Sequence, residues 1–278
     1  MTSHIEGKPH PEPIYNMFYV AETPPQRRLG NEPIWLKIDQ TMKDQLDPLE
    51  FPLTLKRQHL FITNEVGRWV YDTGSPASFG KDTVAPLSGR EIKTHLDMNG
   101  TIVDADSLTD LIGVRVVGLI GTDELNLFDH LIDLRPNQMK LTASKNELHT
   151  HDNTLAVSID LLHGALPYLT ATVGNQTGRY IFDTGAQLSY HVGPIPMDAT
   201  PCTPADDFWI PIGEFHTETY HASVNIQNKE TRLRFGVPPK KLADGHTSMK
   251  IQGIIGNEIM IGCYTGYFPR RGKLHLKL

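Results

Sequence analysis

The chain carries an internal repeat built around two copies of one short motif. Residues 67–74 read GRWVYDTG and residues 178–185 read GRYIFDTG, a separation of 111 positions. Five of the eight positions are identical, and the other three exchange one aromatic or one β-branched residue for another. The same separation relates Ser78 to Ser189. Self-similarity at a fixed offset indicates that the chain folds as two copies of one structural unit.

A second element recurs downstream of each motif. Residues 117–121 read VGLIG and residues 252–256 read QGIIG, and each run leads into a short segment with helical spacing and then a hairpin. The same order of elements therefore occupies residues 51–145 and again residues 155–278. We predict one lobe from each range, as in a tandem duplication, with residues 1–50 forming an N-terminal arm or extra strands.

The composition favours strands over long helices. The 278 residues include 23 Gly and 20 Pro spread along the chain, which indicates many turns and many short strands. Each Asp-Thr-Gly motif follows a run of β-branched and aromatic residues, where the second strand of a hairpin is expected to end. The predicted fold class is therefore all-β, with short helices.

Charge and hydropathy exclude several classes of function. The net charge is -6, and no run of Lys or Arg suggests a nucleic-acid partner. The most apolar stretch, Leu111 to Ile120, is interrupted by Arg115 and is too short to span a membrane. The first residues lack the apolar core of a signal peptide. We expect a soluble, cytoplasmic protein.

Metal-binding and disulfide patterns are weak. The densest cluster of candidate ligands is His149-Thr150-His151-Asp152, and no second pair of ligands stands at a matching spacing. We therefore expect no metal and no other cofactor. Cys202 and Cys263 are the only cysteines, so either a single bridge or two reduced thiols is possible.

The paired motifs resemble those of aspartic peptidases. Asp-Thr-Gly after hydrophobic residues, followed further on by two apolar residues and a glycine, is the signature of that superfamily. Ile254 to Cys263 looks especially like the corresponding segment of a retroviral-type protease, or retropepsin. Retropepsins are homodimers that contribute one Asp per subunit, whereas pepsins hold both lobes in one chain. The resemblance implies a bilobal acid-protease fold, made of two retropepsin-like β-barrel lobes in a single, monomeric chain.

The resemblance implies that Asp72 and Asp183 form the catalytic pair of an aspartic endopeptidase. Two carboxyl groups in contact do not both ionise readily, so they share a proton and can act as base and acid on a water and a peptide carbonyl. By the same resemblance, Thr73 and Thr184 interlock the two loops. The supporting loop residues are Thr73, Gly74, Ser75, Thr184, Gly185 and Ala186.

The two copies differ directly after the glycine, where Ser75 stands in the first and Ala186 in the second. A hydroxyl that donates to a carboxylate favours its charged form. We therefore expect Asp72 to be the preferentially ionised base and Asp183 to carry the proton, with the Ser75 hydroxyl as the cause.

The flap that closes over a substrate is harder to place. In the first interval Met98 to Thr101 is the best hairpin tip, but the tyrosine of a pepsin flap is missing. The second interval carries Trp209 and Tyr220 and a hairpin around Asn225 to Leu233. We expect a flap from the second lobe or from both, with Met98, Trp209 and Tyr220 as candidate substrate contacts; a plain core role for the two aromatic residues stays open.

Two functions compete at this stage. The first is endopeptidase activity on a peptide or protein substrate, bound in extended conformation between the lobes. The second is a catalytically silent protein of the same fold that binds peptides or acts as a scaffold. The intact Asp, Thr and Gly residues of both motifs favour the peptidase.

Overall fold

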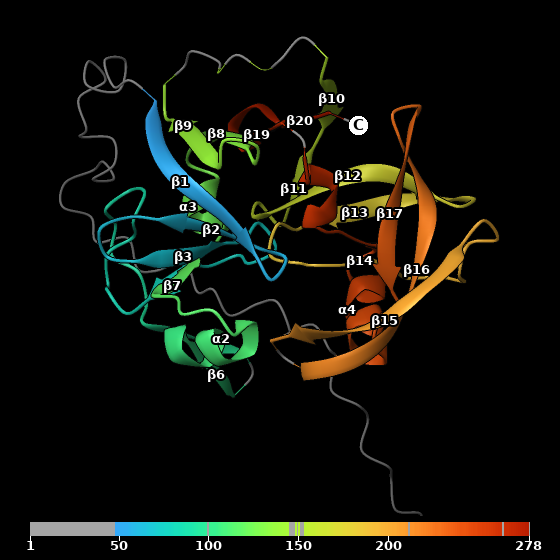
Figure 1. Cartoon of the computed structure of the whole chain (residues 1–278), viewed down its shortest axis with the longest axis horizontal. Helices are drawn as coiled ribbons and strands as arrows, with labels where there is room; N and C mark the ends of the chain where they lie inside the picture. Colours follow the sequence, from blue (N-terminus) through green and yellow to red (C-terminus); the bar gives the residue numbers. More distant parts are fainter. Residues whose placement is uncertain are drawn as a thin grey trace, which may run out of the picture.

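A computed structural model describes most of the chain from Pro48 onward. The described residues are 48–98, 100–144, 148, 150, 153–210, 212–262 and 264–277. Most of the predicted N-terminal arm therefore lies outside them. The expectation of a mostly β protein with short helices is confirmed (Figure 1). Among the described residues, no helix is long and apolar enough to cross a membrane.

The repeat in the sequence appears as two copies of a four-stranded unit. In each copy a hairpin is followed by a strand parallel to its second strand, and a short strand pairs antiparallel on the far side of that one. The first copy consists of β2 (His59–Thr63), β3 (Arg68–Tyr71), β7 (Gly118–Ile120) and β4 (Phe79–Gly80). The second consists of β12 (Leu166–Val173), β13 (Gln176–Phe182), β18 (Gly253–Ile255) and β14 (Ser189–His191).

The registers of the two units also correspond. Tyr71 pairs with Ile120 in the first unit, and Phe182 pairs with Ile255 in the second. These strands are apolar on both faces and buried, as is usual for strands that pair in parallel inside a core. Each Asp-Thr-Gly motif therefore begins where a buried parallel strand ends.

A sheet of six antiparallel strands joins the two halves. Leu131 and Gly266 face each other at its centre, and they are equivalent positions because 266 − 131 equals 253 − 118, the shift between β18 and β7. The sheet is therefore arranged about a local two-fold axis. Its strand order is β10 (Leu155–Ser158), β20 (Lys273–Leu276), β19 (Tyr264–Phe268), β8 (Asp129–Asp133), β9 (Gln138–Thr142) and β1 (Leu49–Lys56).

Side chains from both halves pack across this sheet. The rings of Phe182 and Tyr267 lie 6.1 Å apart, and Tyr71 and Tyr267 are fully buried in the same cluster. Arg271 Nε donates to Asp129 Oδ2 at 2.7 Å, and the Asp129 side chain is completely buried. Large aromatic side chains buried in this way supply much of the stabilisation of a core.

Two hairpins extend beyond the shared framework, one from each half. The first is formed by β5 (His95–Met98) and β6 (Thr101–Asp104), and the second by β15 (Thr200–Trp209) and β16 (Gly213–Ile226). Both reach the same end of the molecule (Figure 1). The remaining elements are α2 (Ala105–Ile112), α3 (Thr122–Leu125), β11 (Asp160–Leu162), β17 (Lys229–Gly236), α4 (Lys240–Ser248), η3 (Asn257–Met260) and η4 (Pro269–Arg271).

Candidate active site

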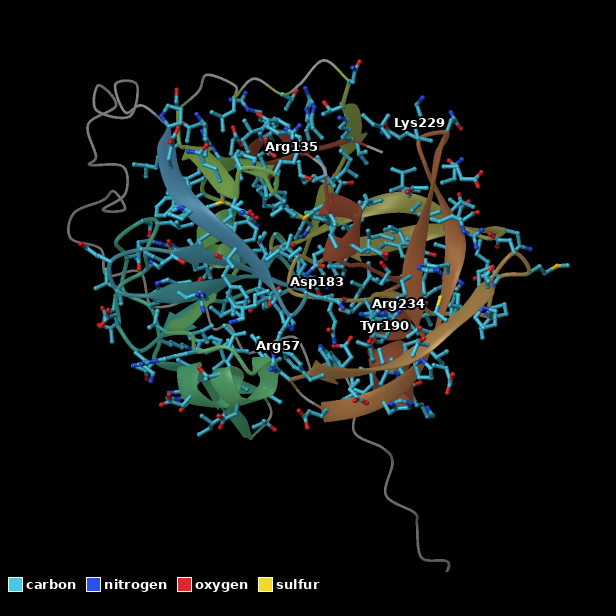
Figure 2. The ribbon with its side chains drawn as sticks, in the orientation of Figure 1. Arg57, Arg135, Asp183, Tyr190, Lys229 and Arg234 are labelled. Atoms are coloured by element: carbon cyan, nitrogen blue, oxygen red, sulfur yellow. The ribbon has the colours of Figure 1, made fainter. Side chains whose placement is uncertain are left out.

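Asp72 and Asp183 occupy equivalent positions, each at the end of a pair of parallel strands. Asp72 N donates to Ile120 O at 3.1 Å, and Asp183 N donates to Ile255 O at 3.0 Å, so each Asp adds one more bond to its ladder. Asp183 lies near the centre of the molecule, where the ribbons of the two halves meet (Figure 2).

Each carboxyl group is held by the backbone of its own loop. Asp72 Oδ1 accepts from the amides of Gly74 and Ser75 at 2.8 and 3.1 Å. Asp183 Oδ1 accepts from the amides of Gly185 and Ala186 at 2.9 and 3.0 Å. One oxygen of each carboxyl is therefore fixed by two amides.

The two threonines lock the loops to each other. Thr73 N donates to Thr184 Oγ1 and Thr184 N donates to Thr73 Oγ1, both at 3.0 Å. Each hydroxyl donates in turn to a carbonyl of the opposite half: Thr73 Oγ1 to Phe182 O at 2.6 Å, and Thr184 Oγ1 to Tyr71 O at 2.9 Å. Both side chains are fully buried, so all four bonds are shielded from water.

The motif glycines are required by close approach between the loops. A Cβ atom on Gly74 would lie 2.2 Å from Asp183 Cγ, and one on Gly185 would lie 2.5 Å from Asp72 Cγ. The glycine after β7, Gly121, meets the same constraint, because its Cβ would lie 2.6 Å from Ala77 O. The Cβ of Gly256 would lie 2.7 Å from Leu188 O. Any side chain at these positions would push the loops apart.

The two carboxyl groups interact with each other, and both line one pocket. Burial raises the pKa of Asp72, and the hydrogen bonds it accepts from Gly74, Asp183 and Ser75 lower the pKa by less. Burial raises the pKa of Asp183 further, and the nearby charge of Asp72 adds to that rise. The two carboxyl groups therefore share a proton, and they titrate as a pair.

The cause expected for this inequality is wrong. The Ser75 hydroxyl donates to Ala77 O at 2.9 Å and not to the Asp72 carboxylate. Only the backbone amide of Ser75 reaches Asp72, and Ala186 offers Asp183 the same amide contact. The difference between the serine and the alanine does not account for the unequal pKa values.

No family model and no curated protein sequence matches the chain. The chemistry of the site is therefore argued from its residues and their contacts.

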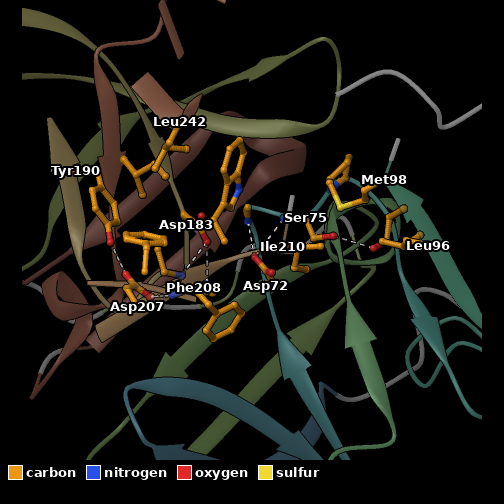
Figure 3. A pocket seen from close by; sticks show the side chains of 18 of the residues that line it. Asp72, Ser75, Leu96, Met98, Asp183, Tyr190, Asp207, Phe208, Ile210 and Leu242 are labelled. Atoms are coloured by element: carbon orange, nitrogen blue, oxygen red, sulfur yellow. Dashed lines mark hydrogen bonds between the residues drawn. The ribbon is translucent and has the colours of Figure 1, made fainter. Parts of the chain in front are cut away.

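Residues from both hairpins line the pocket. Leu96 and Met98 come from β5, and Phe208 comes from β15, with Ile210 after it (Figure 3). Trp209 of β15 also lines the pocket. Met98 and Trp209, two of the three candidate substrate contacts, thus both line the pocket. The hairpin that carries Trp209 was not anticipated, although the Pro211 and Gly213 that follow are a turn signal.

Tyr220 does not belong to the site. It is 5% exposed, stacks on Phe235 at 5.8 Å, and pairs with that residue across β16 and β17. The core role left open by the sequence applies to it. The hairpin expected around Asn225 to Leu233 exists as the turn between β16 and β17, but Lys229 at its tip lies away from Asp183 (Figure 2).

A buried acidic residue that sequence reasoning missed also lines the pocket. Asp207 is 7% exposed, and its Oδ1 accepts from Gln187 Nε2 at 2.7 Å and from Phe208 N at 2.8 Å. Its Oδ2 accepts from the Tyr190 hydroxyl (Figure 3). Burial raises the pKa of Asp207, and the hydrogen bonds from Tyr190, Gln187 and Phe208 lower it by less.

Two further residues missed in the sequence hold the second loop. His59 Nδ1 lies 3.0 Å from Gly185 O, and Asn257 Nδ2 donates to Thr184 O at 3.2 Å. Asn257 Nδ2 also donates to Gln58 O at 2.5 Å, in the turn before β2. Burial lowers the pKa of His59, which favours the neutral ring with its proton on Nδ1 as the donor.

The remaining candidate ligands do not assemble into a second site. Among the described residues, no three His, Cys, Asp or Glu side chains converge on a point. Three members of the His149 to Asp152 cluster lie outside the described residues. Cys202 has a free thiol, with its Sγ 3.1 Å from His221 Nδ1. Its suggested partner Cys263 also lies outside the described residues.

Proposed function

We propose that the chain is an aspartic endopeptidase of the bilobal acid-protease type, with both halves of its catalytic dyad on one polypeptide. The observation that carries the proposal is the pair of interlocked Asp-Thr-Gly loops, which present two interacting carboxyl groups to one pocket. If each motif were only a solvent-exposed turn, the two loops, 111 residues apart, would not be joined by four buried hydrogen bonds.

The unequal carboxyl groups suggest the direction of proton transfer. Asp72, the more acidic member, removes a proton from a water held between the two groups, and the water oxygen bonds to the peptide carbonyl carbon. Asp183 donates its proton to the carbonyl oxygen, giving a tetrahedral diol. The diol then collapses: the carbon–nitrogen bond breaks, the nitrogen takes the proton held by Asp72, and a hydroxyl proton returns to Asp183. The dyad ends with one proton, as it began.

Substrate binding is expected between the two hairpins. Residues on β5 and β15 both line the pocket, and the edge of a hairpin can pair with an extended peptide by main-chain hydrogen bonds. Most of the lining is apolar, so side chains of the peptide can be buried beside the dyad. Because both carboxyl groups lie on one chain, no second copy is needed for catalysis.

Activity should depend on pH through the dyad. The active form carries one proton, so activity falls when pH drops below the pKa of Asp72 and when it rises above that of Asp183. Burial raises both pKa values, so the active window lies above the pH at which an exposed Asp titrates. The two limbs of the profile belong to the coupled pair.

The test is cleavage of a diverse peptide library across a range of pH. Asp72→Asn and Asp183→Asn should each lower kcat/KM by roughly a thousandfold or more, since each removes one partner of the acid–base pair. Asp110→Asn, on the exposed face of α2, is the matched control and should cleave like the unaltered protein. Pepstatin, a mimic of the tetrahedral diol, should inhibit.

Two outcomes would contradict the proposal. Cleavage that survives both dyad substitutions would come from another protein. A folded protein that cleaves no library member at any pH would be the catalytically silent, peptide-binding alternative.

A further inference from the structure

The pocket wall on the side of Asp183 combines apolar rings with one buried carboxyl group. Asp207 lies opposite Phe215 in the hairpin of β15 and β16. Tyr190, Trp209 and Phe215 surround it, and the Tyr190 and Phe215 rings are 6.4 Å apart. Leu242 and Ile254 complete this wall. We call these six residues, Tyr190, Asp207, Trp209, Phe215, Leu242 and Ile254, the Asp207 subsite.

The Asp207 carboxyl group has no cationic partner in the described part of the chain. Its hydrogen-bond donors are the Gln187 amide, the Phe208 backbone and the Tyr190 hydroxyl, all of them neutral. A carboxylate offers about four acceptor positions, so three donors leave roughly one unused. A buried acid is normally paired with a cation, and an acid that borders an open pocket can take that cation from a ligand.

The rest of the pocket also favours a positive charge. Its lining contains the carboxyl groups of Asp72, Asp97, Asp183 and Asp207 and, among the described residues, no Lys, Arg or His. An opening lined by charges of one sign attracts ligand groups of the other sign. Acidic side chains of a peptide would be repelled from the same place.

We propose that the Asp207 subsite selects a basic side chain, lysine or arginine, in the peptide substrate. The aliphatic stem of such a residue packs along Leu242 and Ile254 while its charged end reaches the free position of the Asp207 carboxylate. The faces of Tyr190 and Trp209 add attraction for the cation. This inference rests on the proposed peptidase function and names the substrate class of that site.

The alternative is that Asp207 serves only as a strut, since its bonds to Gln187 and Tyr190 tie the second hairpin to the loop after Asp183. The two roles differ in a measurable way. A strut affects all substrates alike, whereas a recognition group changes the ratio between a basic substrate and an apolar one.

The experiment uses a short apolar peptide in which lysine is scanned through each position, beside matched peptides with norleucine or glutamate. Norleucine has the stem of lysine without its charge. At one position we expect lysine to be preferred over norleucine by about tenfold or more in kcat/KM, the size of a hydrogen bond to a charged group. Glutamate at that position should be the poorest of the three.

Two variants assign that preference to the charge of Asp207. Asp207→Asn keeps the shape and should bring the ratio of lysine to norleucine close to one while norleucine peptides are still cleaved. Tyr190→Phe removes a strut bond but keeps the charge, so the lysine preference should persist. Equal cleavage of lysine and norleucine peptides by the unaltered protein at every position would overturn the inference. A lysine preference that survives in Asp207→Asn would also overturn it.

Binding separates this inference from the peptidase proposal. Peptides with a reduced, uncleavable amide at the scissile position can be titrated by calorimetry. Tighter binding of the lysine peptide by a protein that cleaves nothing would support the subsite and contradict the peptidase. Cleavage without any lysine preference would support the peptidase function and contradict the Asp207 subsite.

Discussion

Besides the threonine interlock, the loop of Asp72 in the first half receives one side-chain donor, whereas the loop of Asp183 in the second half receives two. His59 reaches Gly185 O and Asn257 reaches Thr184 O. The residue equivalent to Asn257 in the first half is Thr122, which donates to Ser75 O at 3.2 Å from within its own half. The shared contacts bring the carboxyl groups together, whereas His59 and Asn257 donate only to the loop of Asp183.

The position equivalent to His59 shows the same difference. Phe61 pairs with Val70 as Tyr168 pairs with Ile181, so counting back two residues aligns His59 with Leu166. Leucine has no donor to offer a loop carbonyl. The hairpins differ too: Gln187 and Tyr190 tie β15 to the second loop, while Pro76 and Phe79 stand 111 positions before them and have no side-chain donor. A duplicated framework thus carries one reinforced loop.

The largest effect should come from removing the hydrogen bonds of the threonine interlock, which the two halves share. Thr73→Val and Thr184→Val each remove two buried hydrogen bonds and leave an amide of the opposite loop without its partner. Each should lower the free energy of unfolding by about 2–4 kcal/mol. Displacement of the dyad should also cost roughly a hundredfold in kcat. Urea denaturation and peptide cleavage measure the two effects.

The interlock is reciprocal, so the two variants should resemble each other, and the double variant should lose less than the sum of the single losses. A control at an exposed threonine, Thr170→Val in β12, should change neither quantity appreciably. A Thr73 variant with full stability beside a strongly destabilised Thr184 variant would show that the loops are not held symmetrically.

A smaller and one-sided effect is expected from His59. His59→Phe keeps a ring beside Phe208, whose ring lies 5.5 Å from the imidazole, but removes the donor to Gly185 O. The Gly185 amide binds Asp183 and lowers its pKa, so loosening this loop should raise the pKa of Asp183. We expect kcat to fall by about tenfold and the basic limb of the pH profile to move to higher pH.

The matched variant is His59→Asn, which keeps a donor near the Nδ1 position and loses the ring. It should restore kcat and the pH profile more fully than His59→Phe does. Asn257→Thr, which installs the residue of the first half, should shift the basic limb in the same direction as His59→Phe. If His59→Phe lowered stability but left the pH profile in place, the residue would be structural and would not position Asp183.

The symmetric part of the molecule was the part that could be predicted from sequence. Two matching eight-residue motifs predict two equivalent hairpins, and the hydrogen bonds between Thr73 and Thr184 follow from the resemblance to aspartic peptidases. The asymmetric part could not be predicted in this way. His59 and Gly185 are 126 positions apart, and Asn257 and Gln58 are 199 apart. Neither contact is marked by a motif, because each depends on how the halves pack together.

The local sequence pattern also gave a wrong expectation for Tyr220 and none for Asp207. Tyr220 was a candidate for the flap because it lies in the right interval, yet strand register places it against Phe235 in the core. The sequence predicts no role for Asp207, because one acidic residue in a polar stretch resembles any surface carboxylate. Only the pairing of β15 with β16 brings it under Tyr190.

The smallest effect is expected at Ser75, where the two loops differ in sequence. Ser75→Ala removes the hydroxyl bond to Ala77 O and leaves the amide bond to Asp72 in place. Burial and the amides set the pKa of Asp72, and neither changes, so the acidic limb of the pH profile should stay where it is. The loss of one hydrogen bond within the loop should cost about 0.5–1.5 kcal/mol in unfolding free energy.

The converse variant, Ala186→Ser, should likewise leave the basic limb unmoved, since the serine hydroxyl in the first loop does not reach its carboxylate. A shift of the acidic limb to higher pH in Ser75→Ala would mean that the hydroxyl stabilises the Asp72 carboxylate during catalysis. The inequality of the dyad would then originate in the difference between Ser75 and Ala186.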